Sequence, residues 1–469
     1  MRLEPARTER EIAAYRAALA GRRAAVIGAG SSGMACVRLL REVGARVTLA
    51  DALPVQQIRQ QADEARALGA QVVGGVGHLA QIAGADLIVS SPGVPIDHPA
   101  LVEARAAGIE VMGSIELAYR LCAAPIIAIT GTNGKGTTCR VLAAMLAAAG
   151  IEHLLAGNIG RPLEGEVTRA RPDAPAVVEV SSFQLEATVQ FRPRVCCILN
   201  IAPDHLDRHR GMREYIAAKS RILANQRPED FAIVNLDDEL ARQTSEAGAA
   251  TKLSISTQWG LADAHVRGGE IVVSLWGREA AICPASDLPL RGRHHLANVL
   301  VAATGARLLG AAPQAIAKAI RAYRPPEHHM ELVAELRGVA FINDTKATNP
   351  AAAVADLSAL ERPFVAIVGG KDKGGDFSEL GRLLAQRARA VVLIGEAAGR
   401  IAQAMGPEGA AERAGTLAEA VRRAAELAEP GDAVILAPAC SSFDMFEDYA
   451  HRGRVFREIV AGLASEAMG

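Results

Sequence analysis

The chain alternates short apolar runs with longer segments in which apolar residues recur at helical spacing. Apolar runs open the segments 24–33, 47–51 and 87–93, and each segment ends in glycine or aspartate. Parallel strands are buried on both faces and read as nearly continuous apolar runs, whereas amphipathic helices show a repeat of 3.6 residues. The pattern therefore predicts strand–helix units that build an α/β protein with parallel sheets.

Two more series of apolar runs follow the first. The second series comprises 126–130, 177–182, 195–201 and 231–236, and the third comprises 340–344, 364–370, 390–395 and 432–437. The Arg-Pro-Pro triplet at 324–326 restricts the backbone and separates the two series as a rigid linker. We therefore expect three domains, at residues 1–112, 113–325 and 326–469.

A glycine-rich loop starts the second series. Residues 125–138 read P-I-I-A-I-T-G-T-N-G-K-G-T-T, which predicts strand, loop and helix in succession. Unpaired amide groups and the helix dipole favour phosphate at such a helix start, and Lys135 adds a positive charge. Gly136 stands where the usual pattern has serine or threonine, so a metal-binding hydroxyl would come from Thr137 or Thr138. The loop predicts a P-loop ATPase-like central domain.

The first series carries another glycine motif, G-A-G-S-S-G at 28–33, and its second strand ends at Asp51. This spacing is typical of a Rossmann-like domain, in which the carboxylate binds a ribose hydroxyl. Alone, the motif would favour a nicotinamide- or flavin-dependent dehydrogenase, but the phosphate loop later in the chain argues against that class. The third series predicts a second Rossmann-like domain at the C-terminal end.

The composition argues against several classes of protein. The 469 residues carry a formal net charge of −1, so neither nucleic acid binding nor a disordered acidic tail is indicated. Seven cysteines without a C-x-x-C pair favour free thiols in a reducing compartment. No signal peptide and no bilayer-spanning apolar run is evident. We therefore expect a cytoplasmic protein, without membrane insertion, that binds small ligands.

Acidic and imidazole groups follow strands of the second series. Glu179 ends one strand in V-E-V-S-S-F-Q, and His205 lies in the D-H-L-D motif at 204–207. Loops after parallel strands leave the same edge of a sheet, so we expect both near the phosphate loop, where they suit magnesium. Lys219 lies on a predicted helix at 214–223. An unmodified ammonium would repel magnesium, so Lys219 could act there only in a neutralised or carbamylated form.

Polar loops end three strands of the third series. They read I-N-D-T-K-A-T-N-P at 342–350, G-G-K-D-K-G-G-D at 369–376 and A-P-A-C-S-S-F-D-M-F at 437–446. Ammonium groups pair with carboxylates, and hydroxyls orient them, so these loops suit an anionic amino acid. We expect all three sheets to turn their carboxyl edges toward one cleft.

Together these motifs resemble the Mur ligases, the ATP-dependent amide-forming enzymes of peptidoglycan precursor synthesis, over nearly the whole chain. I-T-G-T-N-G-K, E-V-S-S-F-Q-L-E, D-H-L-D and A-A-K are shared widely in that family, whereas N-D-T-K-A-T-N, A-C-S-S and G-G-K-D-K look like one member's glutamate-site motifs. The resemblance implies that D-glutamate is added to UDP-N-acetylmuramoyl-L-alanine through an acyl phosphate, with ATP and Mg²⁺. It also implies a monomer that serves cell wall biogenesis, cell shape and cell division.

The resemblance implies roles for individual residues. The UDP-sugar would be held by Ser31, Ser32, Asp51, Ser91, Gly93 and Asn158. ATP would be bound by Gly131, Thr132, Asn133, Gly134, Lys135, Gly136, Thr137, Asn298 and Asp344. The catalytic residues would be Lys135, Glu179, His205 and Lys219, with Thr137, Glu179, His205 and carbamylated Lys219 around magnesium. Glutamate would be held by Lys346, Thr348, Lys373, Ser442 and Tyr449.

Three positions depart from the family pattern. Gly136 replaces a hydroxyl residue, as in folylpolyglutamate ligases of the same superfamily, His329 replaces an arginine after His328, and His295 replaces an asparagine. Alternatives therefore stay open: a folylpolyglutamate-type or other Mur-type ligase, addition of L-glutamate, or a nucleotide-sugar-binding regulator without turnover. The N-terminal nucleotide-binding domain disfavours the folate ligases, which lack it.

Overall fold

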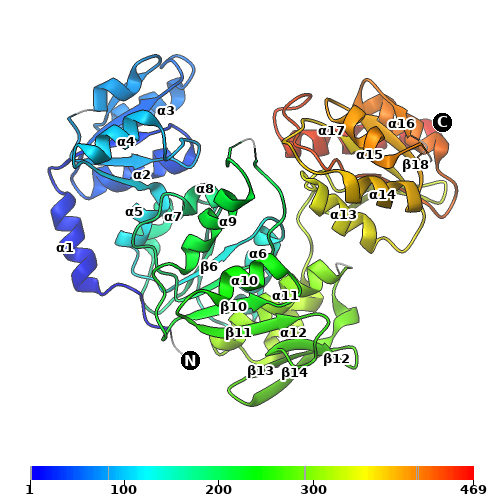
Figure 1. Ribbon diagram of the computed structural model, residues 1–469, viewed down its shortest axis with the longest axis horizontal. Helices are drawn as coiled ribbons and strands as arrows, with labels where there is room; N and C mark the ends of the chain where they lie inside the picture. The colour runs from blue at the N-terminus through cyan, green and yellow to red at the C-terminus, as the bar shows by residue number, and fades with distance from the viewer. Residues whose placement is uncertain are drawn as a thin grey trace. The chain divides into compact units, whose positions relative to one another are not determined.

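The computed structural model describes residues 3–82, 84–206, 208–289, 292–407, 409 and 411–468. Their strands form three separate sheets (Figure 1), and the prediction of three α/β domains is confirmed. Contacts divide the chain into two compact units. The first comprises Met1–Ile201, Arg213–Asp287 and Ala297–Arg321, and the second comprises Ala202–Met212, Leu288–Leu296 and Ala322–Gly469.

The first sheet has the order β3-β2-β1-β4-β5, and all its strands are parallel. Its strands are β1 (Arg23–Ile27), β2 (Arg46–Asp51), β3 (Gln71–Gly74), β4 (Leu87–Ser90) and β5 (Glu110–Gly113). The surrounding helices are α1 (Glu9–Leu19), α2 (Ser31–Glu42), α3 (Arg59–Ala67), η1 (His78–Ile82), α4 (Pro99–Ala106) and α5 (Ser114–Leu121). This strand order places the loops after β1, β2 and β4 at one edge of the sheet.

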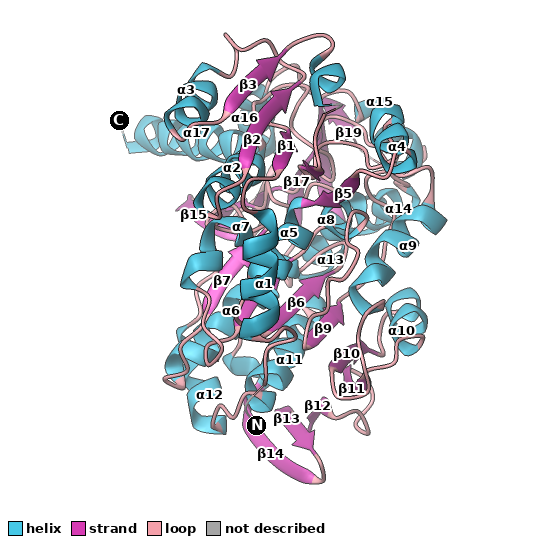
Figure 2. Ribbon diagram, turned by 90° about the vertical axis from the view of Figure 1, so that its left-hand side faces the viewer, coloured by secondary structure: helices cyan, strands magenta, loops and turns pink. Residues whose placement is uncertain are grey.

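The second sheet has nine strands in the order β14-β13-β12-β11-β10-β9-β6-β8-β7. They are β6 (Ile126–Thr130), β7 (Leu154–Gly157), β8 (Ala176–Glu179), β9 (Val195–Ile198), β10 (Phe231–Asn235), β11 (Thr251–Ser256), β12 (Ala264–Arg267), β13 (Glu270–Leu275) and β14 (Arg278–Pro284). In the parallel part, β6 pairs with β8 and β9, and Figure 2 shows β6 beside β9. An antiparallel extension, β12-β13-β14, completes the sheet at one edge.

Helices connect these strands and continue beyond them. They are α6 (Lys135–Ala148), α7 (Leu163–Glu166), η2 (Val167–Arg169), α8 (Ser182–Leu185), α9 (Met212–Ser220), η3 (Arg221–Leu223), α10 (Glu239–Glu246), η4 (Ala285–Asp287), α11 (Arg293–Leu308) and α12 (Pro313–Ala322). The predicted helix at 214–223 is thus α9 followed by a 3-10 turn.

The third sheet has the order β15-β16-β20-β17-β18-β19, parallel except for β15. Its strands are β15 (Glu331–Leu336), β16 (Val339–Asn343), β17 (Phe364–Gly369), β18 (Ala388–Ile394), β19 (Ala411–Arg413) and β20 (Ala433–Leu436). Its helices are α13 (Pro350–Ala359), α14 (Ser378–Arg387), α15 (Ala398–Met405), α16 (Leu417–Leu427) and α17 (Tyr449–Met468). Alternate residues of β17 enter two buried apolar clusters, so both faces of this sheet are covered.

None of the helices in the described ranges combines the length and the apolar character that crossing a bilayer requires. All seven cysteines are buried free thiols, as the sequence predicts.

Candidate functional site

A hollow of about 570 Å³ lies at the carboxyl edge of the first sheet. Its lining includes all six residues predicted to hold the UDP-sugar: Ser31, Ser32, Asp51, Ser91, Gly93 and Asn158. Helix α2 begins in this lining, and its N-cap, Gly30, supplies no side-chain hydrogen bond. The first amides of a helix have no acceptor within the helix, and the dipole there favours anions. The hollow therefore suits a ligand that carries phosphate groups.

Asp51 organises the floor of this hollow. Its carboxylate accepts hydrogen bonds from the backbone amides of Ala29 at 2.6 Å and Leu53 at 2.8 Å. Ser91 donates its hydroxyl hydrogen to the carbonyl of Gly28 at 3.1 Å. These bonds fix the loop after β1 against the ends of β2 and β4. Asp51 thus shapes the loop, and the remaining lone pairs of its oxygens can still accept from a ligand.

Asn158 connects the hollow with the phosphate loop. It follows β7, lines the hollow, and donates its side-chain amide to Glu179 Oε1 at 2.9 Å. Its backbone amide also donates to the carbonyl of Glu179, at 2.9 Å. One side chain therefore couples the predicted UDP-sugar site to a predicted metal ligand.

The loop Gly131–Gly134 and the start of α6 have the predicted strand–loop–helix form. Lys135 Nζ donates to the carbonyls of Gly131 at 2.9 Å and Thr132 at 2.7 Å, which curls the side chain over the loop. Gly134 has a φ of 79°, and a Cβ there would lie 2.5 Å from Asn298 Oδ1. Asn298, a predicted ATP ligand, therefore packs against the loop itself.

Asn200, which follows the adjacent strand β9, holds this loop through two hydrogen bonds. Its Oδ1 accepts from the amide of Asn133 at 2.8 Å, and its Nδ2 donates to the carbonyl of Asn133 at 3.2 Å. The sequence analysis did not assign a role to Asn200. Its position directly after an apolar strand was the available signal, because strand ends converge at one edge of the sheet.

Glu179 is buried at the end of β8, and Thr137 is buried in the first turn of α6. A Cβ on Gly136 would lie 3.0 Å from Glu179 Oε2, so a side chain at this position would press on the carboxylate. A carboxylate and a hydroxyl are oxygen donors of the kind that Mg²⁺ prefers, so these residues fit that ion.

Lys219 also points at the phosphate loop. It is 1% exposed, its Nζ donates to the carbonyl of Gly131 at 2.7 Å, and the Nζ lies 4.4 Å from the centre of the Tyr215 ring. Lys135 Nζ donates to the same carbonyl. Two ammonium groups at one carbonyl would repel each other, and the repulsion is strong where water is excluded. Lys219 and Lys135 thus converge on one carbonyl of the phosphate loop.

His205 belongs to the second unit. Its backbone has a φ of 55°, and its Nε2 lies 3.7 Å from Asp204 Oδ2. The last residue of the D-H-L-D motif, Asp207, lies outside the described residues. Since Thr137, Glu179 and Lys219 belong to the first unit, the gathering of all four around magnesium stays a prediction.

Two of the predicted glutamate ligands line a small cavity in the second unit. Thr348 and Lys373 border a space of about 10 Å³, together with Asp204 and Asn349. Lys373 Nζ donates to Asp204 Oδ1 at 2.6 Å, and Asn349 donates to the other oxygen at 3.2 Å. The ammonium group of Lys373 is therefore paired with the carboxylate of Asp204.

Of the other three predicted glutamate ligands, Lys346 and Ser442 lie on loops of the same sheet, and Tyr449 begins α17. Lys346 Nζ lies 5.6 Å from the centre of the Tyr449 ring, and Ser442 is buried in the loop after β20. That loop is tied to the loop after β16 by a hydrogen bond from the amide of Ala439 to the carbonyl of Ala347, at 2.9 Å.

Arg452 holds these two loops in place, although the sequence analysis missed it. It is 1% exposed on α17, and its guanidinium donates to the Thr345 hydroxyl at 2.8 Å and to the Cys440 carbonyl at 3.2 Å. Burial lowers its pKa to about 10. An arginine in a helix usually indicates a solvated face, so the sequence carried no clear signal for this role.

Asp344, which is predicted to contact the adenosine, is buried beside Asp356 and His329. Its Oδ1 accepts from the amide of Met330 at 3.1 Å, and its Oδ2 has no hydrogen-bond partner among the described residues. Burial and the charge of Asp356 raise the pKa of Asp344 well above its usual value. Burial lowers the pKa of His329, the residue that replaces an arginine, to about 4, so its ring is neutral near pH 7.

The sequence was compared with those of known proteins. It is 43% identical over 442 residues to a protein from Pelotomaculum thermopropionicum named UDP-N-acetylmuramoylalanine–D-glutamate ligase, covering 93% of this chain and 97% of that one. It is 42% identical to a protein of the same name from Acidobacterium capsulatum, covering 94% and 96%. The chain belongs to the Mur ligase family.

Models of the three Mur ligase domains match the chain in order. The N-terminal domain of the MurD-like Mur ligases matches residues 22–113, the Mur ligase middle domain matches 129–306, and the glutamate ligase domain matches 328–440. Among solved Mur ligase structures, MurF from Acinetobacter baumannii aligns with a TM-score of 0.61 at 21% identity, covering 88% of this chain and 91% of that one. That likeness supports the fold.

Proposed function

We propose that this protein is the ligase that joins D-glutamate to UDP-N-acetylmuramoyl-L-alanine, with hydrolysis of ATP to ADP and phosphate, in peptidoglycan precursor synthesis. The observation that carries the proposal is the identity of 38–43% over nearly full length to proteins that bear this name. The Mur ligase family is ATP-dependent. Consumption of ATP and a UDP-sugar also supports a cytoplasmic location. We further propose that the protein is a monomer. Its three domains would comprise residues 1–112, 113–325 and 326–469.

The reaction needs two steps, because a carboxylate is a poor acylating agent. In the first, the terminal carboxylate oxygen of UDP-N-acetylmuramoyl-L-alanine bonds to the γ-phosphorus of ATP, the bond to the β-phosphate oxygen breaks, and ADP leaves. In the second, the glutamate nitrogen attacks the acyl carbon and loses a proton, and the C–O bond to phosphate breaks. The amide and inorganic phosphate are the products.

The first unit supplies the groups for the first step. The amides at the start of α2 and the polar lining around Asp51 would bind the UDP-sugar, while the phosphate loop and Lys135 would hold the ATP phosphates. Asn158 would keep the two sites in register through Glu179, which it contacts at 2.9 Å. Positioning of this kind supplies most of the catalysis in phosphoryl transfer.

We further propose that Thr137, Glu179, His205 and carbamylated Lys219 hold Mg²⁺. Bound magnesium would neutralise negative charge on the phosphates during transfer. Carbamylation removes one proton from the lysine ammonium, joins the resulting amine nitrogen to the carbon of CO₂ and releases a second proton, so it turns a cation into an anion. That change removes the repulsion between Lys219 and Lys135 at the carbonyl of Gly131.

The second unit would hold the glutamate. Lys346 and Lys373 would pair with its carboxylates, Thr348 and Ser442 would orient them, and Tyr449 would lie beside Lys346. Lys373 would exchange Asp204 for a substrate carboxylate as glutamate binds. Asn298 and Asp344 would contact the adenosine.

Replacing Lys373 with methionine should raise the KM for D-glutamate about 10- to 100-fold, because a charged hydrogen bond of 1.5–3 kcal/mol is lost. The change leaves the size of the side chain nearly intact. Initial rates of phosphate release over a range of D-glutamate concentrations would measure the effect.

Lys371→Met is the matched control for that variant, because Lys371 lies two residues away and is exposed. It should leave the KM for D-glutamate unchanged. Equal KM values for the wild type and Lys373→Met would remove Lys373 from the glutamate site.

An isotope experiment tests the proposed chemistry. UDP-N-acetylmuramoyl-L-alanine labelled with ¹⁸O in its terminal carboxylate is turned over with ATP and D-glutamate, and the phosphate is analysed by mass spectrometry. An acyl phosphate predicts one ¹⁸O atom in each phosphate released. Phosphate without label would mean that water, and not the carboxylate, attacks ATP.

A further inference from the structure

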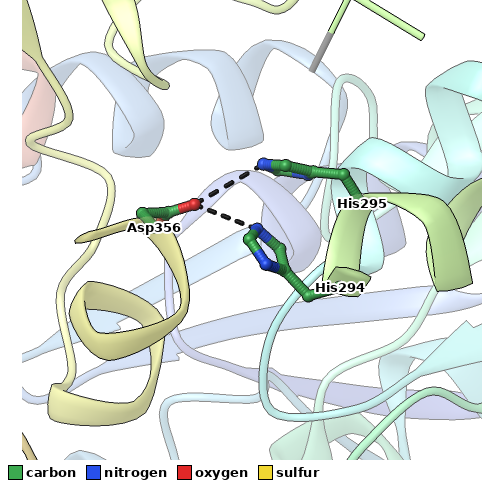
Figure 3. Close-up of side chains that lie close together, drawn as sticks. All are labelled: His294, His295 and Asp356. Atoms are coloured by element: carbon green, nitrogen blue, oxygen red, sulfur yellow. Dashed lines mark hydrogen bonds and ion pairs between the residues drawn. The ribbon is translucent and has the colours of Figure 1, made fainter. Parts of the chain in front are cut away.

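A cluster of imidazole and carboxylate groups lies in the second unit, and the chemistry proposed above leaves most of it without a role. His294 and His295 stand in the first turn of α11, and Asp356 lies on α13 (Figure 3). His295 and Asp356 are buried, whereas the side chain of His294 retains 30% exposure. One nitrogen of each histidine and one oxygen of Asp356 lie within 4.8 Å of one another.

The separations in this triad match those around a metal ion. His294 Nε2 lies 3.0 Å from Asp356 Oδ1, and His295 Nε2 lies 3.5 Å from the same oxygen. In a tetrahedral zinc site with bonds of 2.0–2.1 Å, neighbouring ligand atoms are about 3.3 Å apart. Both separations from Asp356 Oδ1 are therefore close to those that one tetrahedral ion requires.

His295 provides an independent observation. It is 2% exposed, its Nδ1 has no hydrogen-bond partner among the described residues, and its Nε2 makes only the 3.5 Å ion-pair contact with Asp356. A buried polar group without a partner is costly, and such a group commonly marks a ligand or ion that the site is built to hold. Burial also lowers the pKa of His295.

From this geometry we infer that His294, His295 and Asp356 form a binding site for a divalent transition-metal ion of the zinc class. Two imidazoles and one carboxylate, without sulfur, suit Zn²⁺, Co²⁺ or Ni²⁺ better than Mg²⁺, which prefers oxygen ligands. The exposed edge of His294 gives the ion a route from solvent, and a water molecule can complete the coordination. Asp344 and His329 form a second buried triad with Asp356, so they lie next to the proposed site.

Cobalt is a suitable probe, because four-coordinate Co²⁺ absorbs visible light much more strongly than the hydrated ion. The full chain, stripped of metal by a chelator, is titrated with Co²⁺ in excess Mg²⁺ and without nucleotide. We expect one equivalent of Co²⁺ to bind with strong visible absorption, and Zn²⁺ to displace it. His295→Asn restores the residue usual in the family and should weaken Co²⁺ binding at least about 10- to 100-fold.

Three controls make the result decisive. His153→Asn alters a histidine of the first unit and should leave the cobalt spectrum unchanged, as should Glu179→Gln, which alters the proposed magnesium site. Thermal unfolding without metal should show that His295→Asn is folded. If the wild type binds no equivalent of Co²⁺ with strong absorption, or if His294→Asn and His295→Asn keep the wild-type spectrum, the proposed metal site does not exist.

Discussion

Replacing Lys135 with alanine should lower the rate of ATP-dependent amide formation about 1000-fold or more. The Nζ of Lys135 lies over the phosphate loop, bound to the carbonyls of Gly131 and Thr132. Placed there, it would stabilise negative charge as the γ-phosphate is transferred, and loss of one such donor in a water-excluded site costs about 10²–10³ in rate. Coupled measurement of ADP release in the presence of both other substrates would give the effect.

The fold should survive this change, because Lys135 is only partly buried and its hydrogen bonds to Gly131 and Thr132 lie within the loop. The midpoint of thermal unfolding should therefore stay within a few degrees of the wild type. Lys318→Ala is a matched control, since Lys318 is an exposed lysine on α12 of the same unit. It should keep full activity. A Lys135→Ala variant with more than a tenth of wild-type activity would contradict the assignment of the phosphate loop.

Replacing Lys219 with methionine should lower the rate about 100- to 1000-fold without unfolding the protein. Methionine fills a similar volume beside Tyr215 but cannot react with CO₂, so the proposed carbamate is lost along with its contact to magnesium. If Lys219 acts as a carbamate, wild-type activity should also fall when CO₂ and bicarbonate are removed, and it should recover when bicarbonate is restored. Initial rates in degassed and bicarbonate-supplemented buffer measure this.

Lys252→Met is the comparison for Lys219→Met. Lys252 lies in the first unit, is partly buried and also donates to a backbone carbonyl, that of Gly248 at 2.8 Å, but it takes no part in the proposed site. Its variant should remain active and should show the same response to bicarbonate as the wild type. Full activity of Lys219→Met would exclude a catalytic carbamate at this position.

The sequence predicted much of the fold, because continuous apolar runs in parallel strands give a strong local signal. The runs starting at Ala24, Ile126 and Phe364 all lie in or form central strands of their sheets. Strands at or near the sheet edges were harder to predict. For example, β15 (Glu331–Leu336) alternates exposed and partly buried residues, and its pairing with β16 depends on a turn at Arg337 and Gly338 rather than on an apolar run.

The sequence predicted residues of the candidate site where a motif directly follows a strand. All six predicted UDP-sugar residues line one hollow, although Asn158 lies far along the chain from Ser31. Contacts that depend on tertiary packing had no local signal. The bond from Asn158 to Glu179, the burial of Arg452 and the meeting of His295 with Asp356 each join segments that the sequence keeps apart.

The choice of amino acid tests the central claim most directly. Phosphate release from ATP is measured with UDP-N-acetylmuramoyl-L-alanine and, in turn, D-glutamate, L-glutamate, diaminopimelate or lysine, and the nucleotide product is identified by mass spectrometry. The proposed function predicts rapid release and a product enlarged by one glutamate residue with D-glutamate alone. Comparable turnover with any of the other three, or none with D-glutamate, would contradict it.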